Sequence, residues 1–253
     1  TFSSLIADNV TDNGFIKYRR FTNSNANGND LIAPPLDGET WQDFLNSANN
    51  DSDLLDNGGS PLVYAFAPFV KASDDFVNFD ENSSATLNAG TGYRVATDSG
   101  TQLTFTGSVV TGQRAINIED TGAVFPDWNL IGNPYPSYID MTQFLEFVLD
   151  AGPDPDVTNI SILQDASGIY GYDGDVSDGW DIVTLANSTG RLMAPGQGFF
   201  VAADAANVAA YDITFDPSMR TTGSSDDFIL GRNAEDLTFL KLNASTANHS
   251  YKT

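Results

Sequence analysis

The densest group of side chains that could do chemistry is an acidic turn. Asp173, Asp175 and Asp178 are separated by small residues, and Gly179 follows them. Ca²⁺ takes six to eight hard oxygen ligands, and glycine lets backbone carbonyls turn toward the ion. The spacing matches a calcium loop only in part, because Asp178 comes one residue later than the EF-hand pattern requires. Two interpretations stay open, a bound Ca²⁺ and a solvated hairpin loop, and no other cofactor is expected.

Aromatic side chains near this turn offer a second route to a ligand. Tyr172 and Trp180 flank the acidic turn, and Tyr135 and Tyr138 lie in or beside a proline-rich turn. Sugar rings stack on aromatic faces while polar neighbours bind the hydroxyls. We therefore expect these four side chains to bind ligand, and the hairpin between Tyr172 and Trp180 is the best candidate site. Trp128 falls within an apolar run, which predicts core packing instead.

The residue sets of the common hydrolases are missing from this sequence. The single histidine, His249, lies in a polar tail, and the chain has no cysteine, so neither a nucleophile–histidine pair nor a thiolate metal site is predicted. A glycosidase needs only two carboxylates roughly 5 to 9 Å apart, and 34 acidic residues leave that open. We expect no enzyme activity and no catalytic residues, with carboxylate-based glycoside chemistry as the alternative.

The charge and hydropathy of the chain limit its partners. A net charge of −23 repels both phosphate backbones and anionic lipid. No apolar run approaches the roughly 20 residues of a membrane-spanning helix. Nucleic acid binding and direct membrane insertion are therefore not expected.

One pattern of strands and turns occurs twice along the chain. Leu31 and Leu130 begin short apolar runs that end at prolines, at an offset of 99 residues, and the segments 92–96 and 198–202 match at an offset of 106. Near-constant offsets indicate an internal repeat. The offset of 106 also matches Tyr64 with Tyr170, Phe66 with Tyr172, and Phe76 with Ile182. The alternative is one long β chain whose glycine and aromatic spacing resembles itself by chance.

The predicted elements are mostly short strands. They recur about every ten residues between Gly, Asn, Ser and Asp clusters, which is typical of a sandwich or barrel. Each copy also carries one short helix, at about 40–48 and at 141–149. We predict a mainly β fold of two tandem β-sandwich-like (jelly-roll-like) modules. The expected boundaries are a lead-in at 1–14, a first module at 15–122, a second at 123–225, and the start of a further β segment at 226–253.

Two motifs of the second module carry a resemblance to a known group of proteins. Trp128–Ser137 reads WNLIGNPYPS, and 194–201 reads APGQGFFV. They resemble the "WNLIGNPYPS … PAGQGFFV" modules of large secreted Bacteroidetes proteins, which commonly precede a type IX secretion sorting domain. The first module resembles them more weakly, because Ala33-Pro34-Pro35-Leu36 departs from the Gly-Asn-Pro-Tyr form. The resemblance implies an extracellular or cell-surface location within a longer polypeptide.

The resemblance leaves the activity open, because such modules accompany adhesins, proteases and polysaccharide-degrading enzymes. We expect a non-catalytic extracellular module of a large bacterial secreted or cell-surface protein, used for adhesion, glycan contact or structural spacing. Its partner would be an extracellular glycan or another surface protein. The alternatives are an ancillary or carboxylate-based catalytic part of a polysaccharide-degrading enzyme, and a calcium-stabilised stalk segment.

Overall fold

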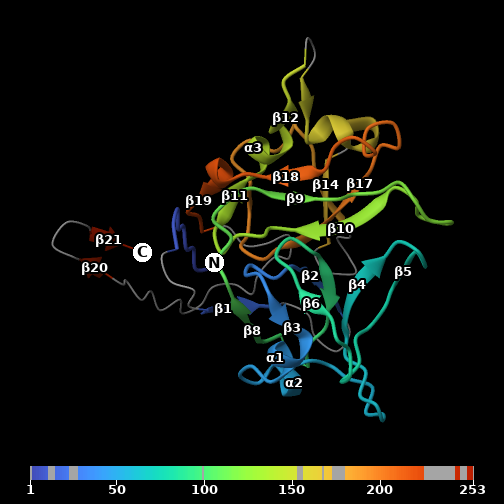
Figure 1. The fold of residues 1–253 in the computed structure, drawn as a ribbon, viewed down its shortest axis with the longest axis vertical. Helices are drawn as coiled ribbons and strands as arrows, with labels where there is room; N and C mark the ends of the chain where they lie inside the picture. Colours follow the sequence, from blue (N-terminus) through green and yellow to red (C-terminus); the bar gives the residue numbers. More distant parts are fainter. Residues whose placement is uncertain are drawn as a thin grey trace.

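The computed structural model describes residues 2–10, 15–22, 28–98, 100–152, 156–166, 168–172, 180–224, 243–245 and 250–252. It confirms a mainly β protein, with several antiparallel sheets and three short α-helices: α1 (Trp41–Leu45), α2 (Asn50–Asp53) and α3 (Met141–Leu145). Figure 1 places the first half of the chain, from blue to teal, below the second half, from yellow to orange. Among the described residues, no helix combines the length and hydropathy that crossing a membrane requires.

Two four-stranded antiparallel sheets form the centre of the molecule. The first has the order β2 (Asp30–Ile32), β7 (Tyr93–Val95), β4 (Phe66–Val70) and β5 (Asp75–Phe76). The second has the order β10 (Trp128–Gly132), β17 (Gly198–Ala202), β14 (Ile169–Tyr172) and β15 (Trp180–Val183). In both sheets the first strand along the chain lies at one edge and pairs with the fourth, so the two sheets share one strand order.

The described residues also form smaller sheets and three 3-10 turns. The strand pairs are β1 (Ile16–Phe21) with β8 (Gln102–Gly107), β9 (Arg114–Ile116) with β18 (Ile213–Phe215), β3 (Glu39–Thr40) with β6 (Thr86–Leu87), β12 (Val148–Asp150) with β13 (Val157–Thr158), and β20 (Asn243–Ser245) with β21 (Ser250–Lys252). In a three-stranded sheet, β11 (Tyr138–Asp140) lies between β16 (Leu192–Met193) and β19 (Arg220–Thr221). The turns are η1 (Ile160–Ile162), η2 (Gln164–Ala166) and η3 (Pro217–Met219).

The strands that precede the prolines end where the sequence predicts. β2 ends at Ile32, two residues before Pro34, and β10 ends at Gly132, two residues before Pro134. Proline cannot donate to a sheet ladder, so neither strand continues past it. The chain then enters a short strand and a capped helix in both halves.

The helices α1 and α3 begin in the same way. The Thr40 hydroxyl accepts a hydrogen bond from the Asp43 N–H at 3.1 Å, and the Asp140 carboxylate accepts one from the Gln143 N–H at 3.0 Å. Such side-chain caps stabilise a helix start by about 1 kcal/mol. The predicted helix at 141–149 is too long, because the chain leaves α3 after Leu145 and forms β12. Pairing with β13 satisfies the backbone there, and local helical spacing does not reveal it.

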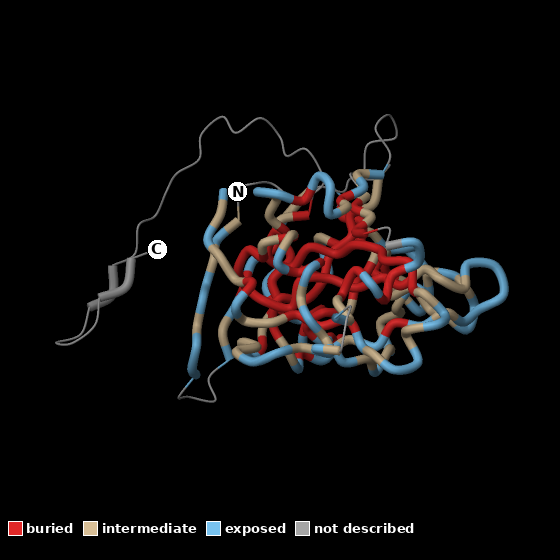
Figure 2. Tube along the Cα trace, turned by 90° about the horizontal axis from the view of Figure 1, so that it is seen from above, coloured by how far each residue is buried: buried red, intermediate tan, exposed pale blue. Residues whose placement is uncertain are grey.

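The interior consists of three hydrophobic clusters. One packs within the first half around Trp41 and Phe66, and another packs within the second half around Phe144 and Phe199. Figure 2 shows these buried segments in red at the centre, with exposed loops outside them. The third cluster lies between the two four-stranded sheets and centres on Phe200. The fold therefore places an apolar layer between the halves as well as inside each.

The two sheets approach each other closely enough for backbone hydrogen bonds. The Ala33 N–H donates to the Gly196 carbonyl at 2.8 Å, and the Gly132 N–H donates to the Gly90 carbonyl at 2.9 Å. A Cβ at Gly198 would lie 2.7 Å from the Ile32 nitrogen, so glycine is required at this contact. Gly132, Gly196 and Gly198, where a Cβ would meet Ala33 or Ile32, thus allow the two halves to approach this closely.

Sheet register corrects the predicted match between the halves at β4. Arg94 pairs with Ala67 across β7 and β4, whereas Phe200 pairs with Tyr170 across β17 and β14. With segment 92–96 matched to 198–202, Tyr170 therefore corresponds to Ala67 and not to Tyr64. A shift of three residues is odd, and an odd shift moves every side chain to the other face of a strand. The offset of 106 matches these aromatic residues by type, but the sheet register does not place them at equivalent positions.

The same correction applies to the next strand pair. Phe69 pairs with Phe76, and Tyr172 pairs with Trp180, so Phe76 corresponds to Trp180 and not to Ile182. Phe69 and Tyr172 then occupy equivalent positions on the face between the sheets.

The segment 2–10 is tied to both halves. The Phe2 N–H donates to the Tyr138 hydroxyl at 2.9 Å, and the Tyr18 hydroxyl donates to the Ser3 carbonyl at 2.7 Å. Arg220 donates to the Ala7 carbonyl at 2.8 Å. The lead-in is therefore held by hydrogen bonds from strands on either side of the junction.

Candidate ligand-binding cavity

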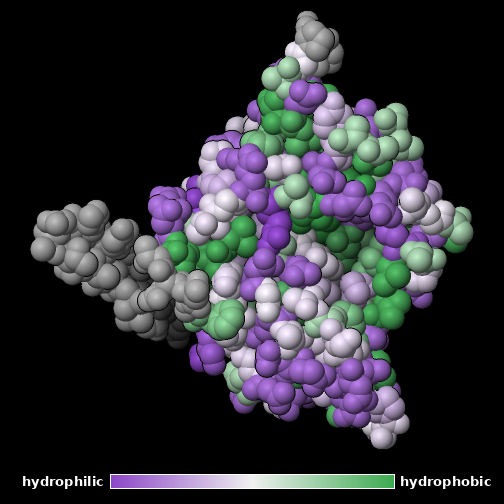
Figure 3. Space-filling model, in the orientation of Figure 1, coloured by the Kyte–Doolittle hydropathy of each residue, from purple (hydrophilic) through white to green (hydrophobic). Residues whose placement is uncertain are grey.

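A cavity of about 540 Å³ lies where the two four-stranded sheets meet. Its volume falls within the roughly 300 to 1,000 Å³ of small-molecule sites in proteins. Figure 3 shows a hydrophobic hollow between the upper and lower halves of the molecule. Both sheets and two segments beside them contribute side chains to its lining. The segments give Asn29 and Phe125, and the sheets give Leu31, Phe69, Phe76, Arg94, Trp128, Tyr170, Tyr172, Trp180, Ile182 and Phe200.

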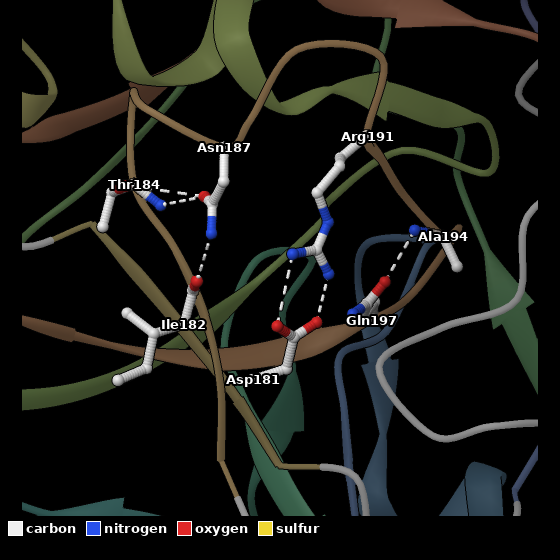
Figure 4. A network of polar contacts seen from close by, with 7 residues as sticks. All are labelled: Asp181, Ile182, Thr184, Asn187, Arg191, Ala194 and Gln197. Atoms are coloured by element: carbon white, nitrogen blue, oxygen red, sulfur yellow. Dashed lines mark hydrogen bonds and ion pairs between the residues drawn. The ribbon is translucent and has the colours of Figure 1, made fainter.

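The outer wall is β15, the edge strand of the second sheet. Successive side chains on a strand point to opposite faces, so Trp180 and Ile182 share the cavity side while Asp181 points the other way. There the two terminal guanidinium nitrogens of Arg191, Nη1 and Nη2, donate to the Asp181 carboxylate, the Nη1 contact measuring 3.2 Å (Figure 4). This pair lies on the face of β15 that points away from the cavity, whereas the ladder with β14 pairs the strand itself.

The turn after β15 is closed by one asparagine. The Asn187 side chain donates to the Ile182 carbonyl at 3.0 Å and accepts from the Thr184 N–H at 2.7 Å (Figure 4). These bonds fix the backbone on both sides of Val183. Trp180 is 50% exposed, so its ring is available at the rim of the cavity.

Aromatic rings in edge-to-face contact make up the wall from the second half. The Trp128 and Tyr170 ring centroids lie 4.7 Å apart, and Phe200 lies 5.7 Å from Trp180. The Tyr172 and Trp180 ring centroids lie 5.3 Å apart, with the rings tilted by 58° rather than edge to face. Such contacts contribute about 0.5 to 1.5 kcal/mol beyond area burial and hold the rings in place. The cavity is therefore largely preformed on this side.

The wall from the first half carries the one charged side chain among the described lining residues, Arg94. Its guanidinium carbon lies 4.3 Å from the centre of the Phe76 ring, a cation–π geometry. Burial lowers the pKa of Arg94, and the neighbouring Asp75 charge acts in the opposite direction. Within the described part of the chain, the Arg94 side chain has no hydrogen bond or ion pair. Asn29 is the other polar side chain on this wall that is not aromatic.

Two cross-connections hold the loop that carries Phe125 at the rim. The Lys71 ammonium donates to the Pro126 and Trp128 carbonyls, each at 2.7 Å. The Asp74 carboxylate accepts from the Val124 N–H at 2.8 Å, and this bond contributes most to lowering its pKa. The turn between β4 and β5 is thus hydrogen-bonded to the segment that leads into β10.

The structure brings two of the four expected ligand-binding aromatics together in the cavity, Tyr172 and Trp180. Tyr135 and Tyr138 lie elsewhere, with 0% exposure. The Tyr135 hydroxyl lies 2.9 Å from the Gly112 carbonyl, and burial raises its pKa. The proline turn buries Tyr135 and strand β11 buries Tyr138, so neither ring has a free face to offer a ligand.

The sequence did not predict that Trp128, Arg94 and Phe200 line a ligand cavity. Trp128 was expected in the core, yet its side chain lines the cavity. Arg94 and Phe200 gave no signal in isolation, because both lie in short strands whose faces depend on register. Matching the two segments 92–96 and 198–202 places them at equivalent positions, and that is the one sequence feature that could have singled them out.

The acidic side chains Asp173, Asp175 and Asp178 lie outside the described residues, so calcium binding there stays a prediction. Within the described ranges, no group of three or more His, Cys, Asp or Glu side chains could hold a metal ion. The described cavity lining contains no carboxylate, so it offers no acid pair for glycoside hydrolysis. The chemistry that this lining offers is stacking, apolar contact and hydrogen bonding.

Comparison with known protein families matches most of the chain. The model of a family described as "Domain of unknown function (DUF8693)" matches residues 3–246. No curated protein and no solved structure matches the chain.

Proposed function

Since this chain belongs to the DUF8693 family, whose description names no activity, we propose a function from its geometry: it is a non-catalytic extracellular module that binds a glycan between its two sheets. The observation that carries the proposal is the aromatic cavity at their junction. Sugar rings present apolar C–H faces that stack on aromatic side chains, and hydroxyls that bind to polar neighbours at the edges.

The proposal includes a tandem duplication, with two β modules packed about an approximate two-fold axis. Support comes from paired contacts across the junction, where Ile32 bridges to Gln197 and Ile131 bridges to Thr91. Under the offsets of 99 and 106, these two bridges are equivalent. An interface in which each partner uses the same surface is the isologous type found in two-fold symmetric dimers. The cavity then lies where two copies of one sheet face each other.

The extracellular setting rests on the resemblance of the WNLIGNPYPS and APGQGFFV motifs to modules of secreted Bacteroidetes proteins. The net charge of −23 supports partners other than nucleic acid or anionic membranes. Adhesion to a glycan-bearing surface is the role that fits both the cavity and this setting.

A glycan-binding screen tests the proposal. The 253-residue chain is applied to an oligosaccharide array, and hits are measured by titration calorimetry with the Trp180→Ala variant and with the control Phe15→Ala. Phe15 is 68% exposed and does not line the cavity. We expect Trp180→Ala to weaken binding at least tenfold, because one stacked ring face is lost, and Phe15→Ala to leave it unchanged.

Two results would count against this function. If no oligosaccharide binds, or if Trp180→Ala binds as tightly as the unchanged chain, the cavity is not a glycan site. Release of new reducing ends during incubation with a bound oligosaccharide would favour the polysaccharide-degrading alternative.

A further inference from the structure

The two walls of the cavity differ at positions that correspond to each other. Leu31 and Leu130 are the same residue type at an offset of 99, and both pack in the cluster between the sheets. At the neighbouring positions the two halves differ. Asn29 in the first half corresponds to Trp128 in the second, and Arg94 corresponds to Phe200. One wall is therefore aromatic, and the other combines apolar side chains with a cation and an amide.

Arg94 occupies an unusual setting for a surface-facing arginine. Its guanidinium lies over the Phe76 ring at 4.3 Å, and the surrounding lining is mostly aromatic. Transfer of a charge from water into such surroundings is costly unless hydrogen bonds or a counter-charge compensate for it. The Asp75 charge favours the charged form of Arg94, but among the described residues no carboxylate lies within ion-pair distance of the guanidinium. The guanidinium N–H groups of Arg94 therefore have no acceptor among the described residues and are available to a ligand.

We propose that Arg94 and Asn29 form an anion subsite, so that the glycan held in the cavity is an anionic one, carrying a carboxylate or sulfate group on its sugar. This inference rests on the proposed function. The planar guanidinium presents paired N–H donors that match two oxygens of a carboxylate or sulfate, and such charge-assisted bonds are about twice as strong as neutral ones. The Asn29 amide can donate to the same group or to an adjacent hydroxyl.

The orientation of the ligand follows from the same asymmetry. The anionic group lies against the first-half wall at Arg94, and the ring face stacks against the second-half wall, where Trp128, Tyr170 and Trp180 gather. A neutral sugar uses only the second of these contacts. The cavity therefore selects for charge on one side and for ring shape on the other.

Salt dependence separates this subsite from a basic surface patch. The chain as a whole repels anions at long range, and added salt screens that repulsion, whereas a contact inside the cavity is screened much less. We expect affinity for an anionic oligosaccharide to stay constant or rise between 50 and 500 mM NaCl. An exposed basic patch would lose affinity over the same range.

The test compares three oligosaccharides of equal length and linkage, one neutral, one of hexuronic acids and one sulfated, by calorimetry against the whole chain. We expect at least one anionic form to bind tenfold more tightly than the neutral form. The Arg94→Met variant keeps much of the apolar stem, so it should lose that preference and retain the neutral affinity. Arg19→Met is the matched control, because Arg19 is exposed on β1 and the change alters the net charge equally.

A second variant covers the case in which Arg94→Met fails to fold. Asn29→Asp puts a negative charge on the same wall and should abolish the preference for anionic sugars while the neutral form still binds. Equal or tighter binding of the neutral form by the unchanged chain would overturn the anion subsite and leave the glycan function standing. Retention of the preference in a folded Arg94→Met protein would overturn it as well, whereas no binding to any of the three would remove both proposals.

Discussion

Asn50 and Asn159 make the same three buried hydrogen bonds, one set in each half of the chain. Each side-chain amide donates to a helix carbonyl and to a strand carbonyl, and each side-chain oxygen accepts from the N–H of that same strand residue. In the first half the partners are Phe44 at 2.7 Å and Thr104 at 2.8 and 2.9 Å; in the second they are Phe144 at 2.8 Å and Thr214 at 2.7 and 2.9 Å. Both amides are fully buried and join a short helix to the strand beside it.

We therefore expect Asn50→Ala and Asn159→Ala to destabilise the protein by similar amounts, about 3 kcal/mol each. The loss leaves two carbonyls and one N–H buried without partners, which costs more than the net value of the bonds themselves. Urea titrations measure this loss as a lower unfolding midpoint at an unchanged m-value. The matched control is Asn46→Ala, whose exposed amide bonds only to the Gln42 carbonyl, and it should cost below about 0.5 kcal/mol. Equal losses for Asn46 and Asn50 would contradict the expectation.

Gly198→Ala tests the close approach of the two sheets. The added Cβ would lie 2.7 Å from the Ile32 nitrogen and 2.8 Å from its carbonyl oxygen, and backbone cannot move aside as a side chain can. We expect a destabilisation of about 3 kcal/mol, in the upper range for overpacking. Gly112→Ala is the control, since a Cβ there meets nothing within 4 Å, and it should change stability by less than about 0.5 kcal/mol. Thermal unfolding of both variants gives the comparison.

Glu39 predicts a specific pH dependence of stability. The Glu39 carboxylate is buried, and only one of its oxygens accepts a hydrogen bond, from the Thr106 N–H at 3.0 Å. Burial raises its pKa from 4.5 to about 7. Because the folded state binds this proton more tightly than the unfolded state, the contribution is fully present below pH 4.5 and is lost as the pH rises through 7. We expect the free energy of unfolding to fall by roughly 1 to 3 kcal/mol between pH 4.5 and 7.5.

The Glu39→Gln variant should lack this slope, as chemical denaturation at several pH values would reveal. Asp74 and Asp216 have lowered pKa values, so their contributions are lost as the pH falls below about 4 and do not overlap this window. A slope that survives the substitution would assign the titration to another group.

The ion pair between Asp181 and Arg191 is partly exposed, with 37% and 34% of the two side chains accessible. Water screens such pairs, so we expect Asp181→Asn to cost below about 1 kcal/mol. The difference from the unchanged protein should shrink further at 1 M NaCl. A loss above 2 kcal/mol in urea titrations would mean that this pair, rather than the sheet ladder, holds β15 in place.

The sequence by itself determined features that depend on neighbours along the chain. Prolines end β2 and β10, and the residues before α1 and α3 cap these helices, because each effect needs only a few consecutive residues. The same local reasoning failed beyond Leu145, where pairing with β13 overrides helical spacing. Local sequence patterns did identify Tyr172 and Trp180, which pair with each other across β14 and β15.

Only the tertiary structure decided which side chains face the cavity. Side-chain direction in a strand alternates with every residue, so the position of Arg94 and Phe200 depends on register with strands far away in the sequence. Burial of Tyr135, which shares its aromatic type with the ligand-facing Tyr172, depends on how the proline turn packs against β18. Residue type and spacing specify the elements, whereas the meeting of two distant sheets creates the cavity, and no single segment contains that information.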